Sequence, residues 1–415
     1  MSLGKVWGLM AVRLNEPGDI SAVAGVELAS LSAGIKKNGK DDLVVLVFDE
    51  SSSCAATFTL NAFCAAPVAL AKQHLSSARP RALLINSGNA NAGTGDIGMQ
   101  NALHSCELLA GKLNCSPEQV LPFSTGVIGE QLPMEKMQSG IERIVDDLSE
   151  DNWLSAAQGI MTTDTIAKAV TRKIELDGRE ITISGIAKGS GMICPNMATM
   201  LSFVATDADI DIDVLQQCLS GCVDSSFNAI TVDGDTSTND ACVLIATAKS
   251  GNARIDDINS ADAKIFIEAL REVCQQLAQA IVRDGEGASK FVTVSVKHAN
   301  SVDEARDVAY TIAHSPLVKT ALFASDPNWG RILAAVGRAG VEKLDITGVH
   351  IYLDDVCIVS AGGVAPDYSE ERGQSVMNKD EIAITVDLSR GDSSAEIWTT
   401  DLSHEYVRIN SEYRS

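Results

Sequence analysis

The sequence is poor in aromatic residues, in basic charge and in long apolar runs, and each shortage excludes a class of protein. Phe, Trp and Tyr make up only 4% of the 415 residues, so Ala, Val, Ile and Leu must build most of the core. The formal net charge of −22 argues against binding to nucleic acid or to an anionic membrane, because both need a basic surface. No apolar run approaches the roughly 18 residues of a membrane-spanning helix. We therefore expect a soluble globular protein.

Cysteine and histidine are present, but their spacing matches neither a disulfide framework nor a metal site. The ten cysteines are scattered singly, which is typical of a reducing cytosol. Cys218 and Cys222 are four residues apart on a predicted helix, a spacing that more often marks one buried face than a pair of ligands. The six histidines form no HxxxH or CxxH pattern. The first residues, MSLGKVWGLMAV, lack the organisation of a secretory signal. We expect a cytoplasmic protein without a metal.

Strand-like and helix-like segments alternate along the chain, and this alternation predicts a layered α/β architecture. A chain of 415 residues is also long enough for two domains or lobes. A hairpin is predicted at 173–183, where apolar alternation runs into and out of an Asp177-Gly178 turn. Short apolar runs predict buried strands at 42–48, 82–85, 201–206 and 242–248. Helical patterns cover 99–113, 211–223, 261–282 and two segments within 302–325, and a further helix start is predicted at Ser116-Pro117.

Four Gly- and Asn-rich loops interrupt this alternation, at 86–95, 124–129, 188–192 and 233–240. Loops on a rigid scaffold commonly carry catalytic residues, although each of these loops taken alone is most simply a turn. The GVIGE and KGSGM segments lack the spacing of a nucleotide-binding glycine loop. The loops therefore mark candidate places for chemistry without naming it.

The stretch KGSGMICPNMATML, residues 188–201, contains one candidate nucleophile. A threonine hydroxyl is a weak nucleophile unless a neighbouring base takes its proton. A cut before Thr199 would supply that base, because a free α-amino group is partly unprotonated at neutral pH. The same hydroxyl could make the cut by attacking the Ala198 carbonyl, given a strained bond and donors for the oxyanion. This chemistry is feasible, but a structural threonine at the start of a strand is the simpler interpretation.

The same stretch closely resembles the nucleophile motif of the ornithine acetyltransferase family, the bifunctional glutamate N-acetyltransferases. The resemblance extends over nearly the whole chain, through long motifs in the same order. These motifs are AGIKKNGKDDLVVL (33–46), FTLNAFCAAPV (58–68), NSGNANAGTG (86–95), STGVIG (124–129), MTTDT (161–165), DGDTSTND (233–240), EGASKF (286–291), DPNWGRILAAVGRAG (326–340) and INSEYRS (409–415). Ordered long motifs are more specific than any short pattern, so the chain is identified as a member of this family.

The resemblance implies an autoprocessed enzyme of arginine biosynthesis that works by ping-pong acetyl transfer. The cut would fall between Ala198 and Thr199, giving an α chain of residues 1–198 and a β chain of residues 199–415. Thr199 would take the acetyl group from N2-acetylornithine and pass it to L-glutamate. The resemblance also implies an αββα sandwich like that of N-terminal-nucleophile enzymes, with a smaller α/β lobe whose boundary is left open. The expected assembly is α2β2.

The resemblance also assigns residues to the site. Thr125 and Gly126 match the oxyanion-hole pair, and they would otherwise be interpreted as a glycine turn after a strand. The matched substrate-binding positions, which include the nucleophile, are Thr162, Lys188, Thr199, Glu286, Asn410 and Ser415. Without the resemblance, Lys188 and Glu286 would be interpreted as solvated charges. The adjacent Thr163 leaves the assignment of Thr162 open.

Two other readings of the sequence stay open at this stage. An N-terminal-nucleophile amidohydrolase or aminopeptidase would also cut itself before a threonine, but would let water resolve the acyl-enzyme. A non-enzymatic binding protein would carry a structural threonine and remain one polypeptide. The sequence predicts no cofactor, and no CoA-binding signature decides whether acetyl-CoA is an additional substrate.

Overall fold

The computed structural model describes residues 11–194 and 200–412. The chain divides into two compact units, and each is described by itself. The larger unit comprises residues 16–228 and 235–281. The described residues of the smaller unit are 11–15, 229–234 and 282–412. The expected second lobe is therefore present, and its boundary falls near residue 282 rather than near the predicted cut at Ala198–Thr199.

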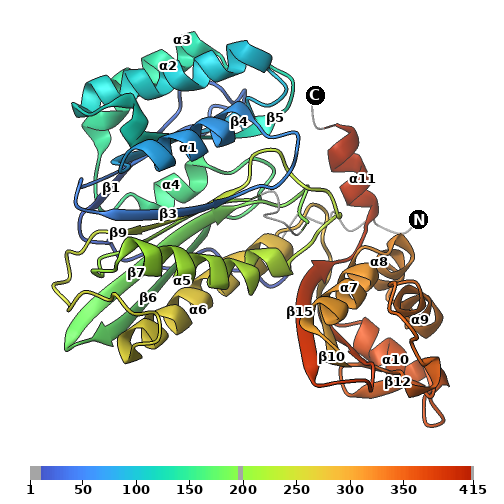
Figure 1. Ribbon diagram of the computed structural model, residues 1–415. Coiled ribbons are helices and arrows are strands. Elements are labelled where there is room, and N and C mark those ends of the chain that lie inside the picture. The colour runs from blue at the N-terminus through green and yellow to red at the C-terminus, as the bar shows by residue number, and fades with distance from the viewer. Residues whose placement is uncertain (1–10, 195–199, 413–415) are drawn as a thin grey trace. The chain divides into compact units, whose positions relative to one another are not determined.

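The larger unit contains two mixed sheets (Figure 1). The first has the order β1-β2-β4-β5, in which only β4 and β5 are parallel. The second has the order β3-β9-β8-β7-β6, in which only β8 and β9 are parallel. The strands of the first sheet are Val26–Leu31, Leu43–Phe48, Ala82–Asn89 and Val120–Val127. Those of the second, in sheet order, are Ser53–Phe58, Ala241–Ala246, Leu201–Thr206, Arg179–Lys188 and Lys168–Leu176.

Strand β2 shows why these segments are continuous apolar runs. Its residues alternate between two cores: Val44 and Leu46 belong to the core between the sheets, whereas Leu43 and Val45 face a second core under helices. A strand that is covered on both faces needs apolar residues at every position. The run LVVLVF is the consequence.

Helices cover the outer face of each sheet, so the larger unit is an αββα sandwich, as expected (Figure 1). Helices α2 and α3 share a core with the first sheet, and α1 packs beside them on β5. Helix α5 packs on β3 and β9, and α6 lies over Gly185 of β7. Short helix α4 lies between the sheets and contacts β1 and β7. These helices are Ala66–Ser77 (α1), Gly95–Leu113 (α2), Met134–Ile144 (α3), Trp153–Gly159 (α4), Ile212–Asp224 (α5) and Ala261–Arg283 (α6).

The smaller unit is built on a six-stranded sheet of order β13-β12-β11-β14-β10-β15. Only β10 and β14 are parallel. Its strands, in chain order, are Phe291–Ala299, His350–Leu353, Val356–Ser360, Gly363–Val364, Glu381–Asp387 and Ser393–Thr400. Its helices are Val302–Ala313 (α7), Pro316–Phe323 (α8), Trp329–Gly337 (α9), Glu370–Met377 (α10) and His404–Ser411 (α11). Residues 229–234 join this unit through Thr231, whose amide donates to the Trp398 carbonyl at 2.9 Å.

Most of the expected elements are present, and one of them is shorter than an α-helix. The hairpin β6–β7 turns at Asp177 and Gly178, whose φ angles of 50° and 69° are those of a tight hairpin turn. The helix start predicted at Ser116-Pro117 is present, with Ser116 as the N-cap, but it continues only as a single 3-10 turn, Pro117–Gln119, before β5 begins. A capping box is present there, but a cap can start a helix without sustaining it.

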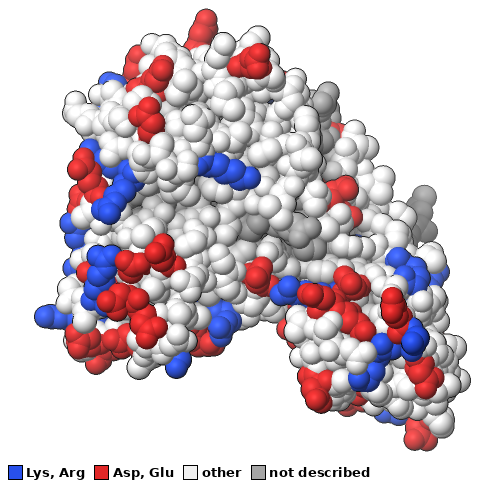
Figure 2. All heavy atoms as spheres, in the orientation of Figure 1, with Lys and Arg blue, Asp and Glu red and all other residues white. Residues whose placement is uncertain are grey.

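The surface is consistent with the acidic composition. Acidic side chains are spread over the visible face of both units, with basic side chains among them (Figure 2). Within the described part of the chain, no helix has the length and hydropathy needed to span a bilayer.

Candidate active site

Strand β5 ends in the predicted oxyanion-hole pair. Thr125 is buried, with 7% of its surface exposed. Gly126 has a φ of +135°, and a Cβ atom there would overlap the backbone of Gly88 and Asn89 on neighbouring β4. Only glycine can occupy this position, because it alone tolerates both the backbone angle and the close approach. The paired ends of two parallel strands, where the register is irregular, therefore position the Thr125 hydroxyl.

Lys188 is the last residue of strand β7 and lies beside Thr125. Its side-chain nitrogen is 3.3 Å from the Thr125 hydroxyl oxygen, and only 3% of the residue is exposed. The interpretation of Lys188 as a solvated surface charge is therefore wrong. A buried ammonium must be compensated by nearby acceptors or charge.

Asp164 supplies that compensating charge. Its carboxylate accepts hydrogen bonds from the Gly189 amide at 2.7 Å and from the Lys168 ammonium at 2.7 Å. Burial alone would raise the pKa of this carboxyl, but the charges of Lys168 and Lys188 outweigh that effect and hold the pKa well below its usual range. The ionised carboxylate thus fixes the backbone next to Lys188 and balances the charge of two lysines.

The MTTDT loop is tied to the same place. Asp164 also accepts a hydrogen bond from the Thr162 amide at 2.9 Å. The hydroxyl groups of Thr163 and Ser190 are 2.7 Å apart and share a hydrogen bond. Both threonines therefore lie against the KGSGM loop, and the assignment of Thr162 rather than Thr163 as a substrate contact stays a prediction.

Lys36 is a further, partly buried cation that sequence reasoning missed. Its ammonium donates to the carbonyl groups of Asp41 and Gly159, at 2.7 and 3.1 Å. Burial lowers the pKa of Lys36 to about 8, although the charges of Asp42 and Asp164 oppose the shift. Lys36 lies in the AGIKKNGK motif, which was the sequence signal that could have identified it as a site residue.

Glu286 and Asn410 form a second cluster, in the smaller unit. The Asn410 amide donates to a carboxylate oxygen of Glu286 at 2.7 Å, and Glu286 is only 7% exposed. The interpretation of Glu286 as a solvated charge is therefore also wrong. A carboxylate forms strong, charge-assisted hydrogen bonds with an ammonium group.

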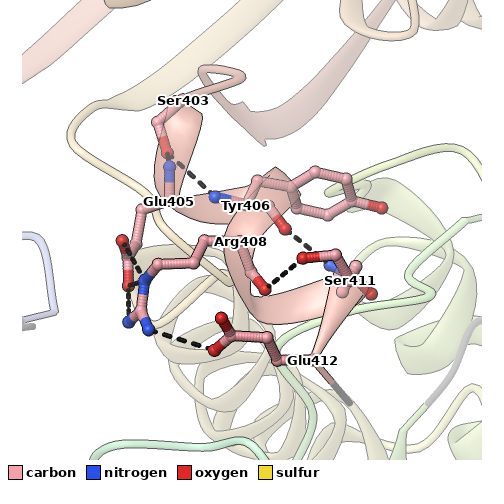
Figure 3. Close-up of polar contacts among 7 residues, drawn as sticks. Ser403, Glu405, Tyr406, Arg408, Ser411 and Glu412 are labelled. Carbon is pink, nitrogen blue, oxygen red and sulfur yellow. Dashed lines mark hydrogen bonds and ion pairs between the residues drawn. The ribbon is translucent and has the colours of Figure 1, made fainter.

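Helix α11 carries Asn410 and is anchored at its start. The Ser403 hydroxyl accepts hydrogen bonds from the amides of Glu405 and Tyr406, which caps the helix (Figure 3). Arg408 pairs with Glu405 and Glu412 along the same helix (Figure 3). The Tyr406 hydroxyl donates to Asp233 at 3.1 Å, in the segment 229–234. The C-terminal region is thus fixed up to residue 412 by its own contacts.

The predicted residues are brought together in two groups. Thr125, Gly126, Lys188 and Thr162 lie in the larger unit, while Glu286 and Asn410 lie in the smaller one. Ala198, Thr199 and Ser415 lie outside the described residues. Among the described residues, no group of three or more His, Cys, Asp or Glu side chains could hold a metal ion.

The site combines a buried lysine, a threonine hydroxyl and a glycine-specific position at the end of β5. Such groups can stabilise the negative charge that develops on an acyl group during its transfer. The model of the ArgJ family matches residues 27–415, and the chain belongs to this family. The resemblance found in the motifs is therefore confirmed.

Individual relatives match over almost the full length. The arginine biosynthesis bifunctional protein ArgJ of Pseudomonas fluorescens is 55% identical over 98% of this chain and 100% of its own length. The protein of the same name from Methylococcus capsulatus is 56% identical, over 95% of this chain and 96% of its own. A crystal structure of the bifunctional ArgJ of Bacillus halodurans is 41% identical, with a TM-score of 0.49, over 51% of this chain and 99% of that one.

Proposed function

We propose that this chain transfers the acetyl group of N2-acetylornithine to L-glutamate, giving ornithine and N-acetylglutamate. As a member of the ArgJ family, it is an acyltransferase of arginine biosynthesis. The observation that carries the proposal is the 55% identity to a bifunctional ArgJ protein over essentially the whole of both chains. The buried Lys188–Thr125 pair supports the proposal, because the pair places a positive charge and a hydroxyl group next to each other.

The proposed reaction uses Thr199 twice. First, its hydroxyl attacks the Ala198 carbonyl, the C–N bond breaks, the nitrogen takes up a proton, and water hydrolyses the resulting ester. The products are chains of residues 1–198 and 199–415, and the second begins with a free α-amino group. That amine then accepts the hydroxyl proton when Thr199 attacks the acetyl carbonyl, and it returns the proton to the departing amine of ornithine. Glutamate enters and its amine takes the acetyl group from Thr199.

The oxyanion of each tetrahedral intermediate is assigned to Thr125 and Gly126. A hydroxyl and a backbone N–H that are held rigidly need no reorganisation as charge develops. The ammonium of Lys188, 3.3 Å from the Thr125 hydroxyl, adds positive charge beside it. Substrate contacts are assigned to Thr162, Lys188, Glu286, Asn410 and Ser415. The Glu286 carboxylate is suited to the side-chain ammonium of ornithine.

The sheet order supports an assembly that persists after the cut. Strands β8 and β9 of the second chain lie between β3 and β7 of the first, so hydrogen bonds join the chains on both sides. We propose an α2β2 assembly in the cytoplasm, with no cofactor and with acetyl-CoA as an additional acetyl donor for glutamate. The name of the P. fluorescens relative includes the word bifunctional.

Intact mass and an acetyl-transfer assay test the central proposal. The wild-type chain should give two fragments that meet at Ala198/Thr199, whereas Thr199→Ala should remain a single species of 43.8 kDa. The wild type should form N-acetylglutamate from N-acetylornithine and glutamate, and Thr199→Ala should not. Absence of product from the cut wild type would overturn the proposal.

Two further arms separate the related reactions. Incubation with N-acetylornithine alone measures hydrolysis, and release of acetate at a rate unaffected by glutamate would indicate an amidohydrolase. Incubation with glutamate and acetyl-CoA measures the second donor, and the expected product is again N-acetylglutamate.

A further inference from the structure

Asp240 is a buried carboxyl at the end of the DGDTSTND loop, immediately before β9. It is 1% exposed, and its Oδ1 atom accepts a hydrogen bond from the Met200 amide at 2.9 Å. That amide nitrogen is bonded directly to the carbonyl carbon of Thr199, about 1.33 Å away. Asp240 therefore binds the peptide group that joins the proposed nucleophile to strand β8.

The second carboxylate oxygen of Asp240 is unusual. Among the described residues, Oδ2 is buried and has no hydrogen-bond partner. Burial raises the pKa of this carboxyl well above its usual value, against the opposing effects of the Met200 amide, the nearby Ser237 hydroxyl and the charge of Lys188.

Asn239, the residue before it, holds the other half of the proposed site. Its side-chain amide donates to the Ser124 carbonyl at 2.9 Å and to the Ala90 carbonyl at 2.7 Å. Ser124 directly precedes Thr125 on β5. Two consecutive side chains thus reach β5, which carries the predicted oxyanion-hole pair, and Met200, which directly precedes β8 in the other sheet.

We propose that Asn239 and Asp240 are positioning residues that hold Thr199 in register with Thr125 and Gly126. The inference rests on the proposed function, because it takes Thr199 as the nucleophile. Acyl transfer needs the attacking oxygen and the oxyanion donors in a fixed mutual geometry, and a misplacement of about 1 Å costs roughly 10²-fold in rate. The two side chains set that geometry from one rigid dipeptide.

The test compares three substitutions in the full chain. Asp240→Ala removes the acceptor for the Met200 amide, Asp240→Asn keeps an acceptor oxygen, and Asn239→Ala removes the bonds to Ser124 and Ala90. Asp207→Ala is the matched control, because the 8% exposed Asp207 follows the opposite end of β8 and accepts a hydrogen bond from the Thr182 amide at 2.9 Å. The measurements are the rate of cutting by intact mass, kcat and KM per cut chain, and the melting temperature.

Asp240→Ala and Asn239→Ala should lower both the cutting rate and kcat by roughly 10-fold to 10²-fold, with KM for N-acetylornithine within about 3-fold of the wild type. Asp240→Asn should restore both rates to within about 3-fold. Asp207→Ala should lose a similar amount of melting temperature but keep both rates. If Asp240→Ala does not fold, Asp240→Ser takes its place in the comparison.

The inference is overturned if Asp240→Ala resembles Asp207→Ala in cutting and kcat, or if Asp240→Asn is as impaired as Asp240→Ala. A wild-type chain that stays whole and transfers no acetyl group would instead overturn the proposed function, and the inference with it. The two failures are therefore distinguishable in one set of measurements.

Discussion

Thr125 owes its position to the residue that follows it. Gly126 adopts a backbone angle that other residues avoid, and this brings β5 close to Gly88 on β4. The hydroxyl of Thr125 is then held beside Lys188. The proposed catalytic role of this hydroxyl can be tested by removing it while keeping the shape of the side chain.

Thr125→Val should therefore lower kcat for acetyl transfer by roughly 10²-fold to 10³-fold, the cost of one lost oxyanion donor. Thr125→Ser keeps the hydroxyl and is the matched control, with an expected loss of less than about 10-fold. Steady-state rates per cut chain and melting temperatures are measured for both variants. Equal rates for Thr125→Val and the wild type would remove Thr125 from the oxyanion hole.

Asp164 compensates the buried positive charges of Lys168 and Lys188 in the larger unit. Asp164→Asn should lower the free energy of unfolding by about 3–5 kcal/mol at pH 7, because it leaves Lys168 buried without its carboxylate. Glu180→Gln is the control: Glu180 pairs with Lys173 on the exposed hairpin β6–β7, where such pairs contribute about 0–1 kcal/mol. Urea unfolding measures both variants.

The same carboxyl predicts a pH dependence with a defined sign. The folded-state pKa of Asp164 is lower than its value in the unfolded chain, which is about 4. Its stabilisation is therefore fully present above about pH 4 and is lost as the pH falls toward the folded-state pKa. Below about pH 4, the free energy of unfolding should decrease more in the wild type than in Asp164→Asn. An identical fall in both would show that other carboxyls account for it.

The sequence predicted the identity of these residues better than their environment. Thr125, Lys188 and Glu286 were assigned to the site because they lie in motifs that the family shares, and these assignments stay predictions. Their burial was not predictable, because Lys188 is compensated by Asp164 and Glu286 is contacted by Asn410, each far away in the sequence. Asp240 was missed for the same reason: its partner Met200 is forty residues earlier, and nothing in DGDTSTND singles out the last residue.

At the scale of elements, local patterns succeeded where two signals agreed. The hairpin β6–β7 combined alternation with an Asp-Gly turn, and β2 combined an apolar run with suitable length. The segment after Ser116 had only a helix start, and β5 followed at once. Pairing between distant strands, such as β3 with β9, is set by contacts that no local pattern contains.

Two glycines in these elements should respond to alanine with opposite signs. Gly178→Ala should destabilise by about 1 kcal/mol, because the turn requires a φ of +69°. Gly111→Ala should stabilise by about 0.5–1 kcal/mol, because Gly111 lies within α2, where a Cβ atom meets nothing within 4 Å. Urea midpoints with unchanged m-values are the measurement. The same sign for both variants would contradict this account of the backbone.

At the scale of the whole molecule, chain order and spatial grouping do not coincide. Residues 229–234 belong to the smaller unit, although the residues on either side of them belong to the larger one. The proposed cut at Ala198–Thr199 lies within the sequence span of the larger unit. The two products of the cut are therefore different from the two units, which length and composition alone could not have predicted.

The five-stranded sheet of the larger unit contains strands from both proposed products of the cut. Strands β8 and β9 come after the cut, and β3, β7 and β6 come before it. The melting temperature of the cut protein should therefore rise with protein concentration, since unfolding separates two chains. The melting temperature of the uncut Thr199→Ala chain should depend less steeply on concentration, because its unfolding separates only the two copies of the proposed assembly. Calorimetry over a hundredfold dilution distinguishes them, and equal behaviour would contradict a shared sheet.

The interleaved strands also change the molecularity of folding. The newly made chain folds in a first-order process, in which both halves of the sheet are tethered and always meet. After the cut, the same sheet can be rebuilt only by a second-order encounter of two separate polypeptides, each with unpaired strand edges exposed in the meantime. The proposed self-cleavage would therefore make unfolding of the protein harder to reverse. After denaturation and dilution, the cut protein should therefore recover a smaller fraction of its folded structure than the uncut Thr199→Ala chain.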